Sequence, residues 1–261
     1  MRAERMAEET LEVNLRRCLD TLPRMLELGF KPPRDESDGA HNRAGTSAGI
    51  AASMHAETVS LMYERGDDVT DIAAWWDAHV ETVLDLYDFR ATLHPSEFMA
   101  LDWSVGTLYT AWSTLSKVAW SVLLLGAEDP RTIRQVEQVE TGVNRVVDLV
   151  MNLVVPGREV TDTVRHERPY GPLLAVLEAP AEAREVLMGK FVKTWYNQSR
   201  KMPWWGDHSR VPHMYIGYWC LEAAVVSVLL DIDDTTFRDN EFYPADLADH
   251  GRALRAGRSA S

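Results

Sequence analysis

Apolar side chains recur every three or four residues along most of the chain, which is the spacing of one face of an α-helix. No convincing alternation of apolar and polar residues, the signature of a half-buried strand, interrupts this pattern. The pattern therefore predicts an all-α fold, a multi-helix bundle of about eight helices with no significant sheet. The helices are expected at residues 4–28, 47–65, 70–90, 97–125, 130–155, 181–200 and 213–231, with a last one that begins at Pro244.

Proline, glycine and charged residues mark the predicted ends of these helices. Residues 31–45 are rich in all three and are expected to form a loop, and His94-Pro95 is expected to break the chain. Gly66 suits the C-terminal cap of the second helix. Pro23 is expected to perturb the first helix, because proline removes a backbone donor.

The segment 156–180 holds four prolines and is expected to be a connection with one short helix. It separates an N-terminal helical region, residues 1–155, from a C-terminal helical region, residues 156–261. One continuous bundle fits the pattern equally well, so both arrangements stay open at this stage.

The chain is strongly acidic, and its acids are unevenly placed. Its 261 residues carry 40 Asp and Glu against 27 Lys and Arg, a formal net charge of −13. Residues 60–150 hold 15 acids against 6 bases, and residues 205–250 hold 9 against 2. Neutralising phosphates takes clustered Lys and Arg, so this composition argues against direct nucleic-acid binding and favours a basic protein partner.

The cysteines and the N-terminus indicate a reducing compartment. Cys18 and Cys220 lie in apolar helical stretches and are expected to be buried thiols. The N-terminus, MRAERMAEETLEV, is charged where a signal peptide needs an apolar run. The longest apolar stretches fall short of a membrane span. We therefore expect a cytoplasmic protein with no membrane partner.

Two acidic stretches suggest an enzymatic alternative. Residues 67–71, DDVTD, spell the magnesium-binding motif of all-α isoprenoid synthases, and Asp233-Asp234 with Glu241 loosely resembles their second metal motif. Phe237, however, stands where a Ser or Thr ligand is expected. The first stretch follows Gly66 and so begins a helix, where carboxylates favour the positive end of the dipole. We predict no metal or other cofactor; the alternative requires the two stretches to converge on one cavity.

Other candidate chemistry has a simpler structural interpretation. Residues 45–49, GTSAG, spell a nucleophile elbow, but a polar loop precedes them, so Ser47 is interpreted as a helix N-cap. His208 and His213 flank a proline-containing loop and suit backbone hydrogen bonds better than a metal. Glu222 falls on or beside an apolar helix face. It is either a general base with a raised pKa or, as we prefer, a buried carboxylate paired with an Arg, Tyr or His.

One combination of motifs near the C-terminus is far more specific. Residues 215–224 read YIGYWCLEAA, Asp233-Asp234 follows, and residues 243–247 read YPADL. This GYWxxEAA pattern, Asp pair and YPxDL resemble the C-terminal region of the PoNi immunity proteins. Those proteins are bacterial inhibitors of PoNe-type DNase toxins, which are often delivered by type VI secretion. The resemblance covers roughly the last 55 residues, and residues 60–66, SLMYERG, look like the family's Tyr-to-Gly helix end.

The resemblance implies an all-α, cytoplasmic protein without catalytic activity, which binds a cognate DNase toxin and neutralises it. An acidic surface is complementary to the basic groove of a DNase and would occlude its DNA-binding or active site. A regulatory or scaffold bundle with another basic partner is a further hypothesis, and the oligomeric state stays open. The family motif is expected to be structural, and Tyr218, Trp219, Glu222, Tyr243 and Pro244 are expected to serve in packing and helix pairing. Its members are Tyr215, Gly217, Tyr218, Trp219, Glu222, Asp233, Tyr243 and Pro244. The composition-based candidates for toxin contact are Asp67, Asp68, Asp71, Asp77, Asp85, Asp88, Asp234, Asp239 and Glu241.

Overall fold

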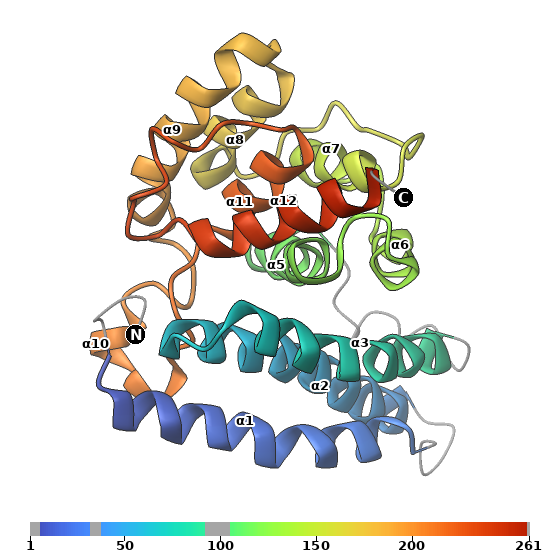
Figure 1. Ribbon diagram of the computed structural model, residues 1–261. Helices are drawn as coiled ribbons and strands as arrows, with labels where there is room; N and C mark the ends of the chain where they lie inside the picture. Colours follow the sequence, from blue (N-terminus) through green and yellow to red (C-terminus); the bar gives the residue numbers. More distant parts are fainter. Residues whose placement is uncertain (1–5, 32–37, 92–104, 260–261) are drawn as a thin grey trace. The chain divides into compact units, whose positions relative to one another are not determined.

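The computed structural model describes residues 6–31, 38–91 and 105–259 (Figure 1). In these residues the chain forms eleven α-helices and one short 3-10 helix, and no strand. The predicted all-α class is therefore confirmed. No helix in the described ranges combines the length and the apolar character needed to cross a membrane.

The chain packs into two compact units. The first unit comprises residues 1–102 and 206–217, and the second comprises residues 103–205 and 218–261. The short segment 206–217 thus belongs to the first unit, although both of its flanks belong to the second. The predicted regions 1–155 and 156–261 are defined along the chain, whereas these units are defined by packing.

Three long helices form the first unit. They are α1 (Glu8–Gly29), α2 (Asp38–Arg65) and α3 (Val69–Ala91); α1 packs along α2, and α2 packs along α3 (Figure 1). Helix α1 buries Leu11, Leu15, Cys18 and Leu22, which recur at the spacing of one helix face. Two short elements from late in the chain, α10 (Asp207–Arg210) and the 3-10 helix η1 (Pro212–Met214), complete the unit, and η1 packs against α1.

The ends of α2 correct one prediction and confirm another. The helix begins at Asp38, so the predicted loop 31–45 is wrong for its second half, and Ser47 lies inside the helix rather than at its N-cap. Residues 38–46 hold two alanines, two glycines and five polar residues, so their composition alone did not indicate that the helix extends through them. Gly66 ends the helix as predicted: its φ is +98°, and its N–H donates to the carbonyls of Met62 and Tyr63. Pro23 lies within α1, which runs through it without a break.

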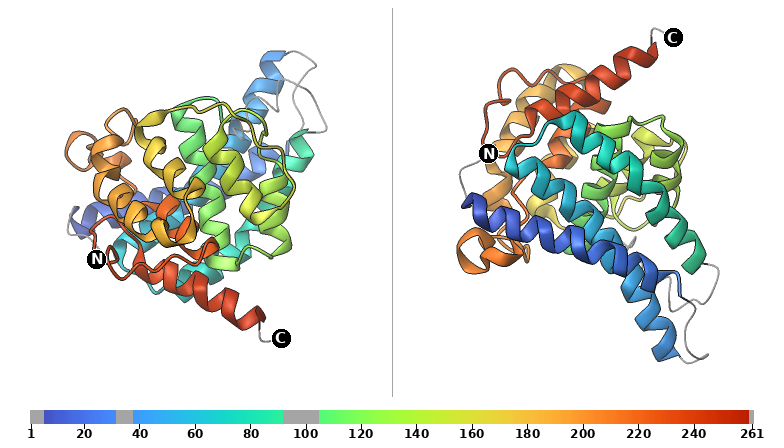
Figure 2. Two further views of the ribbon diagram at one scale, coloured as in Figure 1. Left: turned by 90° about the horizontal axis from the view of Figure 1, so that it is seen from above. Right: turned by 60° about the horizontal axis from the view of Figure 1, so that its bottom comes forward.

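The second unit is built around α5 (Leu108–Leu125), which buries most of its side chains. A capping box formed by Thr107 and Thr110 begins this helix. Helix α5 packs against α6, α11 and α12, and α8 packs along α9 (Figure 2). The other helices of the unit are α6 (Pro130–Glu137), α7 (Arg145–Val154), α8 (Glu167–Glu178), α9 (Ala181–Gln198), α11 (Leu221–Leu229) and α12 (Ala245–Ser259).

Two predicted helices differ from the structure, and in each a glycine with positive φ gives the reason. The predicted helix 130–155 is interrupted between α6 and α7, where Gly142 has φ +75°. The predicted helix 213–231 begins only at Leu221, because Gly217 has φ +97° and the chain before α11 is not α-helical. The predicted break at His94-Pro95 and the first part of the predicted helix 97–125 lie outside the described residues.

Candidate functional site

The acidic residues between α2 and α3 are held by local contacts. Asp67 accepts two hydrogen bonds from Arg65, at 2.7 Å from Nε and 2.5 Å from Nη2, and Arg65 Nη1 also donates to Glu12 at 2.6 Å. Asp68 Oδ1 accepts from the backbone N–H of Thr70 at 2.8 Å and from the Thr70 hydroxyl. Asp68 therefore caps the N-terminus of α3. An ion pair with Arg65 and an N-cap therefore account for Asp67 and Asp68, the first two acids of the sequence DDVTD, without a metal.

Helix α3 carries an acidic face. Asp71, Asp77, Asp85 and Asp88 are all exposed, and helical spacing places them on one side of α3. Glu81 is also exposed and lies four residues from both Asp77 and Asp85, so it belongs to the same face. The sequence-based candidates omitted Glu81, although its spacing from its neighbours was visible in the sequence. These five residues are called the α3 acidic face below.

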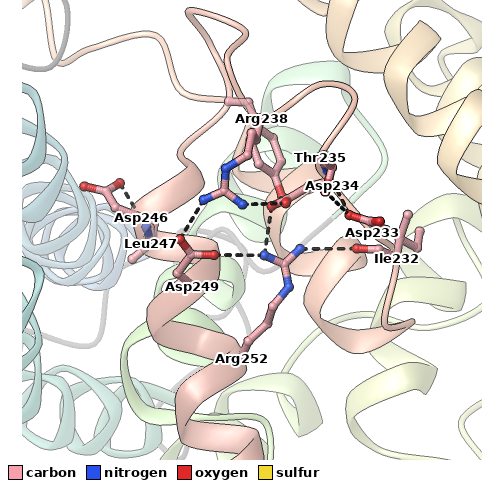
Figure 3. Close-up of polar contacts among 10 residues, drawn as sticks. Ile232, Asp233, Asp234, Thr235, Arg238, Asp246, Leu247, Asp249 and Arg252 are labelled. Atoms are coloured by element: carbon pink, nitrogen blue, oxygen red, sulfur yellow. Dashed lines mark hydrogen bonds and ion pairs between the residues drawn. The ribbon is translucent and has the colours of Figure 1, made fainter.

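Asp234 is the buried centre of an ion-pair network in the second unit (Figure 3). Its side chain is almost fully buried, at 3% exposure. Arg238 Nη1 donates to its Oδ1 at 2.8 Å, Arg252 Nη1 donates to its Oδ2 at 2.8 Å, and the Tyr243 hydroxyl donates to its Oδ2 at 3.0 Å. The expectation that Asp234 belongs to an exposed acidic surface is therefore wrong. The two arginines and the tyrosine hydroxyl provide hydrogen-bond donors to both carboxylate oxygens inside the fold.

Asp249 closes the network from α12. It accepts from Arg238 Nη2 at 2.7 Å and from Arg252 Nη1 at 3.1 Å. Figure 3 shows the two arginines between the two carboxylates, with Arg252 also reaching the carbonyl of Ile232 at 3.2 Å. We call Asp234, Arg238, Asp249 and Arg252 the carboxylate clamp. It ties the connection that follows α11 to α12, and the motif resemblance alone did not reveal its arginines.

The remaining acids of the connection divide into turn and surface residues. Asp233 Oδ1 accepts from the Thr235 N–H at 2.9 Å and from its hydroxyl at 2.6 Å, and these bonds hold the pKa of Asp233 below its ordinary value. Asp239 and Glu241 are exposed. After them, the carbonyl of Pro244 accepts from the N–H of Ala248 at 3.0 Å, so α12 begins directly after this proline.

Hydrogen bonds from α1 and α2 anchor segment 206–217 within the first unit. Buried Asn14 of α1 donates from Nδ2 to the carbonyls of Pro212 at 2.9 Å and Tyr215 at 3.1 Å. Ser60 of α2 donates to the carbonyl of Ile216 at 2.7 Å. The Tyr215 hydroxyl donates to the buried carboxylate of Glu64 at 2.6 Å. The motif residue Tyr215 thus anchors segment 206–217, and Gly217, with its positive φ, follows directly.

The aromatic motif residues lie in the core of the second unit. Tyr218 is buried, with its ring centroid 5.0 Å from that of Tyr196 and 5.6 Å from that of Trp204. Trp219 is buried as well. The backbone N–H of the next residue, Cys220, donates to the carbonyl of Phe242 at 2.8 Å. This backbone bond joins the start of α11 to the chain just before Tyr243, so the two halves of the motif meet in space. Tyr243 is itself buried against Phe237.

Glu222 is a buried carboxyl at the start of α11. It is 1% exposed, and its Oε1 accepts from the Tyr170 hydroxyl of α8 at 3.3 Å. Burial raises the pKa of Glu222 to about 7, against the opposing effect of hydrogen bonds from its own backbone and from Tyr170. Cys220, two residues earlier, is a buried free thiol whose pKa is raised by the same burial. Both cysteines are buried, as predicted, and the deep position of Glu222 suits packing rather than contact with a substrate.

The described residues supply no assembled metal centre. Within the three described ranges, no group of three or more His, Cys, Asp or Glu side chains could hold a metal ion. His213 contributes its backbone carbonyl, which accepts from Arg17 at 2.7 Å. No strand precedes Ser47 in the described part of the chain, so it has no nucleophile-elbow geometry.

Comparison with known protein families identifies the C-terminal region. Residues 144–247 match the family model described as PoNe immunity proteins (PoNi), C-terminal. The match covers α7, α8, α9, α11, the buried Glu222 and the connection with Asp234. The resemblance that the motifs predicted is confirmed for this part of the chain. Comparison with curated proteins finds no match.

A solved structure shares the fold. Protein PA2201 from Pseudomonas aeruginosa matches with a TM-score of 0.73 at 20% sequence identity. The match covers 97% of this chain and 93% of that one. At this identity the likeness establishes the fold and nothing about activity.

Proposed function

We propose that this protein is an immunity protein that binds and neutralises a cognate PoNe-type nuclease toxin. The single observation that carries the proposal is the match of residues 144–247 to the PoNe immunity family. The role is one of binding, in which the protein protects cells from the toxin and performs no chemistry itself. A DNase acts on the chromosome, so its inhibitor is needed in the cytoplasm.

Charge supports occlusion of the toxin as the mode of inhibition. A DNase must present a basic groove to bind phosphates, and a protein with net charge −13 is attracted to such a groove. The α3 acidic face offers five carboxylates along one side of a helix, a linear arrangement that suits a groove built for a phosphate backbone. Asp239 and Glu241 are a second exposed candidate, on the connection before α12.

The buried polar contacts support a fixed shape for the binding surfaces. The carboxylate clamp holds the connection that displays Asp239 and Glu241, and Asp68 caps the helix that displays the α3 acidic face. A preordered surface loses less entropy on association and so binds more tightly. In this proposal Asp234 and Asp68 therefore support the surface and do not contact the toxin.

Co-expression with the cognate PoNe-type toxin tests the proposal. We expect cells that make both proteins to survive with intact DNA, and the two proteins to co-purify as a complex. The matched control is a toxin variant without nuclease activity, which should co-purify equally well and kill in neither case. Continued killing by the active toxin, or absence of a complex with either toxin, would refute the proposed function.

A further inference from the structure

The second half of α9 and the turn after it carry a cluster of exposed basic residues. Residues 186–206 contain no Asp or Glu, although the chain has 40 of them. The same stretch holds four basic residues, all exposed: Lys190, Lys193, Arg200 and Lys201. We call these four residues the α9 basic cluster. This stretch is therefore positively charged, whereas the chain as a whole has a net charge of −13.

The cluster lacks the ion pairs that engage other basic residues. Arg65, Arg145, Arg238 and Arg252 each pair with carboxylates. Among the residues that the structure describes, no carboxylate pairs with any member of the α9 basic cluster. Arg200 Nη2 donates to the side-chain oxygen of Asn197, a neutral acceptor, at 3.2 Å.

The helix dipole accounts for only part of this arrangement. Cations are stabilised near the C-terminal end of a helix, but the effect falls off within the last turn. Arg200 and Lys201 follow the end of α9 at Gln198 and fit that explanation. Lys190 and Lys193 lie eight and five residues before the end, beyond the reach of the dipole. Val186, one turn before Lys190, is 61% exposed and extends the same side of the helix.

Fixed aromatic rings adjoin the cluster. Trp205 Nε1 donates to the carbonyl of Tyr196 at 3.1 Å, and the two rings stack with centroids 5.6 Å apart. Tyr196 also stacks on Phe242, with centroids 4.8 Å apart. The guanidinium carbon of Arg200 lies 5.9 Å from the Trp205 centroid. Half-buried Trp and Tyr beside Arg are the residues in which interface binding energy is concentrated.

We propose that the α9 basic cluster is a second docking surface, which takes a carboxylate-rich surface of the partner toxin. This inference rests on the proposed function. A nuclease that uses a divalent cation holds it with clustered carboxylates, so such a toxin presents an acidic region in addition to its basic groove. Nucleic acid suits the cluster less well, because bases need an open ring face and Trp205 is already covered by Tyr196 and Arg200.

Charge reversal on α9 tests the inference. The variant K190E/K193E changes the net charge by −4, and the matched control R16E/R24E makes the same change at two exposed positions of α1. The probe is the purified cognate PoNe-type toxin, and the dissociation constant is measured by calorimetry. We expect the constant to rise at least tenfold for K190E/K193E and to stay within twofold of wild type for the control. The variant K190R/K193R should bind like wild type, and circular dichroism should show equal helix content in all.

The outcomes separate this inference from the proposed function. If wild type binds the toxin and K190E/K193E binds as tightly as the control, the docking surface is refuted and the immunity function stands. The docking surface is also refuted if K190E/K193E keeps its affinity for the toxin but no longer binds a single-stranded oligonucleotide. It is refuted as well if the variant keeps that affinity but no longer self-associates in sedimentation experiments. If wild type does not bind the toxin, the proposed function fails first, and this inference fails with it.

Discussion

Arg252 Nη1 lies 2.8 Å from Asp234 Oδ2, and this ion pair joins two residues that are 18 positions apart in the chain. Asp234 belongs to the connection after α11, and Arg252 belongs to α12. The same arginine donates from Nη2 to the carbonyl of Ile232, so one side chain holds both a charge and a backbone group of the connection. The Asp pair of the family motif therefore has a structural role: Asp234 is buried in the carboxylate clamp, and Asp233 accepts hydrogen bonds within a turn.

Removal of Asp234 should strongly destabilise the second unit. The change Asp234→Ala removes the buried partner of Arg238 and Arg252, which are partly exposed and keep Asp249, so we expect a loss of about 1–3 kcal/mol. The control Asp239→Ala removes an exposed acid of the same connection and should change stability by less than about 0.5 kcal/mol. Urea unfolding followed by circular dichroism measures both. Equal midpoints for the two variants would show that the clamp is not stabilising.

The buried carboxyl of Glu222 should make stability depend on pH. Its pKa is raised from 4.5 to about 7 in the folded protein, so between these values the folded state binds more protons than the unfolded state. The contribution is fully present below pH 4.5, decreases as pH rises and is lost above about pH 7. A shift of this size corresponds to about 3 kcal/mol. Glu222→Gln keeps the shape without titrating, so the wild-type-minus-variant difference in unfolding free energy should fall across this range; a flat difference contradicts the prediction.

The buried imidazole of His55, in the first unit, should make stability depend on pH in the opposite sense. Its buried ring stacks on Trp76 with centroids 4.0 Å apart, and burial lowers its pKa from 6.5 to about 3, with a smaller contribution from His79. The unfolded state therefore binds the extra proton. The stabilising contribution is complete above pH 6.5 and is lost as pH falls toward 3. His55→Phe keeps an aromatic ring without titration, so acid should destabilise wild type more than this variant. Thermal melts between pH 4 and 7 measure the difference, and parallel losses would contradict it.

Asn14 should control the order of segment 206–217. Asn14→Ala removes two hydrogen bonds and leaves the carbonyls of Pro212 and Tyr215 without this donor, at a cost of about 1–3 kcal/mol. Hydrogen exchange in peptides that cover 206–217 should speed up in the variant and stay unchanged in α11. The control Arg16→Ala removes an exposed side chain of the same helix. Unchanged exchange in Asn14→Ala would mean that the other anchors suffice.

Helical periodicity predicted the fold class well, because apolar spacing reports directly on which face of a helix is buried. The predicted helix boundaries were wrong where the backbone conformation of a single residue ended or delayed a helix. Apolar spacing continues through 213–220, yet Gly217 adopts a positive φ there and delays α11 to Leu221. The part of α2 before Ser47 was predicted to be a loop because residues 38–46 are rich in polar side chains and glycine. Local propensity and tertiary contacts decide such cases, and composition does not show them.

The candidate site was predicted less completely, because burial of a charge depends on partners far along the chain. Asp234 and Asp239 look alike in the sequence, but only Asp234 meets arginines from two different segments. The acids of α3 are different: their exposure follows from helical spacing alone, and the same spacing would have added Glu81. Surface charge can therefore be predicted from periodicity, whereas a buried ion pair needs the three-dimensional structure.

Neutralising the α3 acidic face should slow association with the toxin. The variant D77N/D85N/D88N removes three exposed carboxylates from one side of α3, and long-range attraction to a basic groove acts mainly on the association rate. We expect that rate to fall roughly tenfold at low salt, with little change in dissociation, and the deficit to shrink as salt screens the charges. The control E128Q/E167Q/E182Q makes the same net-charge change at exposed positions of the second unit. Stopped-flow binding at several salt concentrations compares the two variants. If the association rate falls equally in both variants, net charge alone explains the attraction and the α3 acidic face has no special role. A lower rate for the α3 variant alone would show that the position of the charges matters, because the two variants have the same net charge.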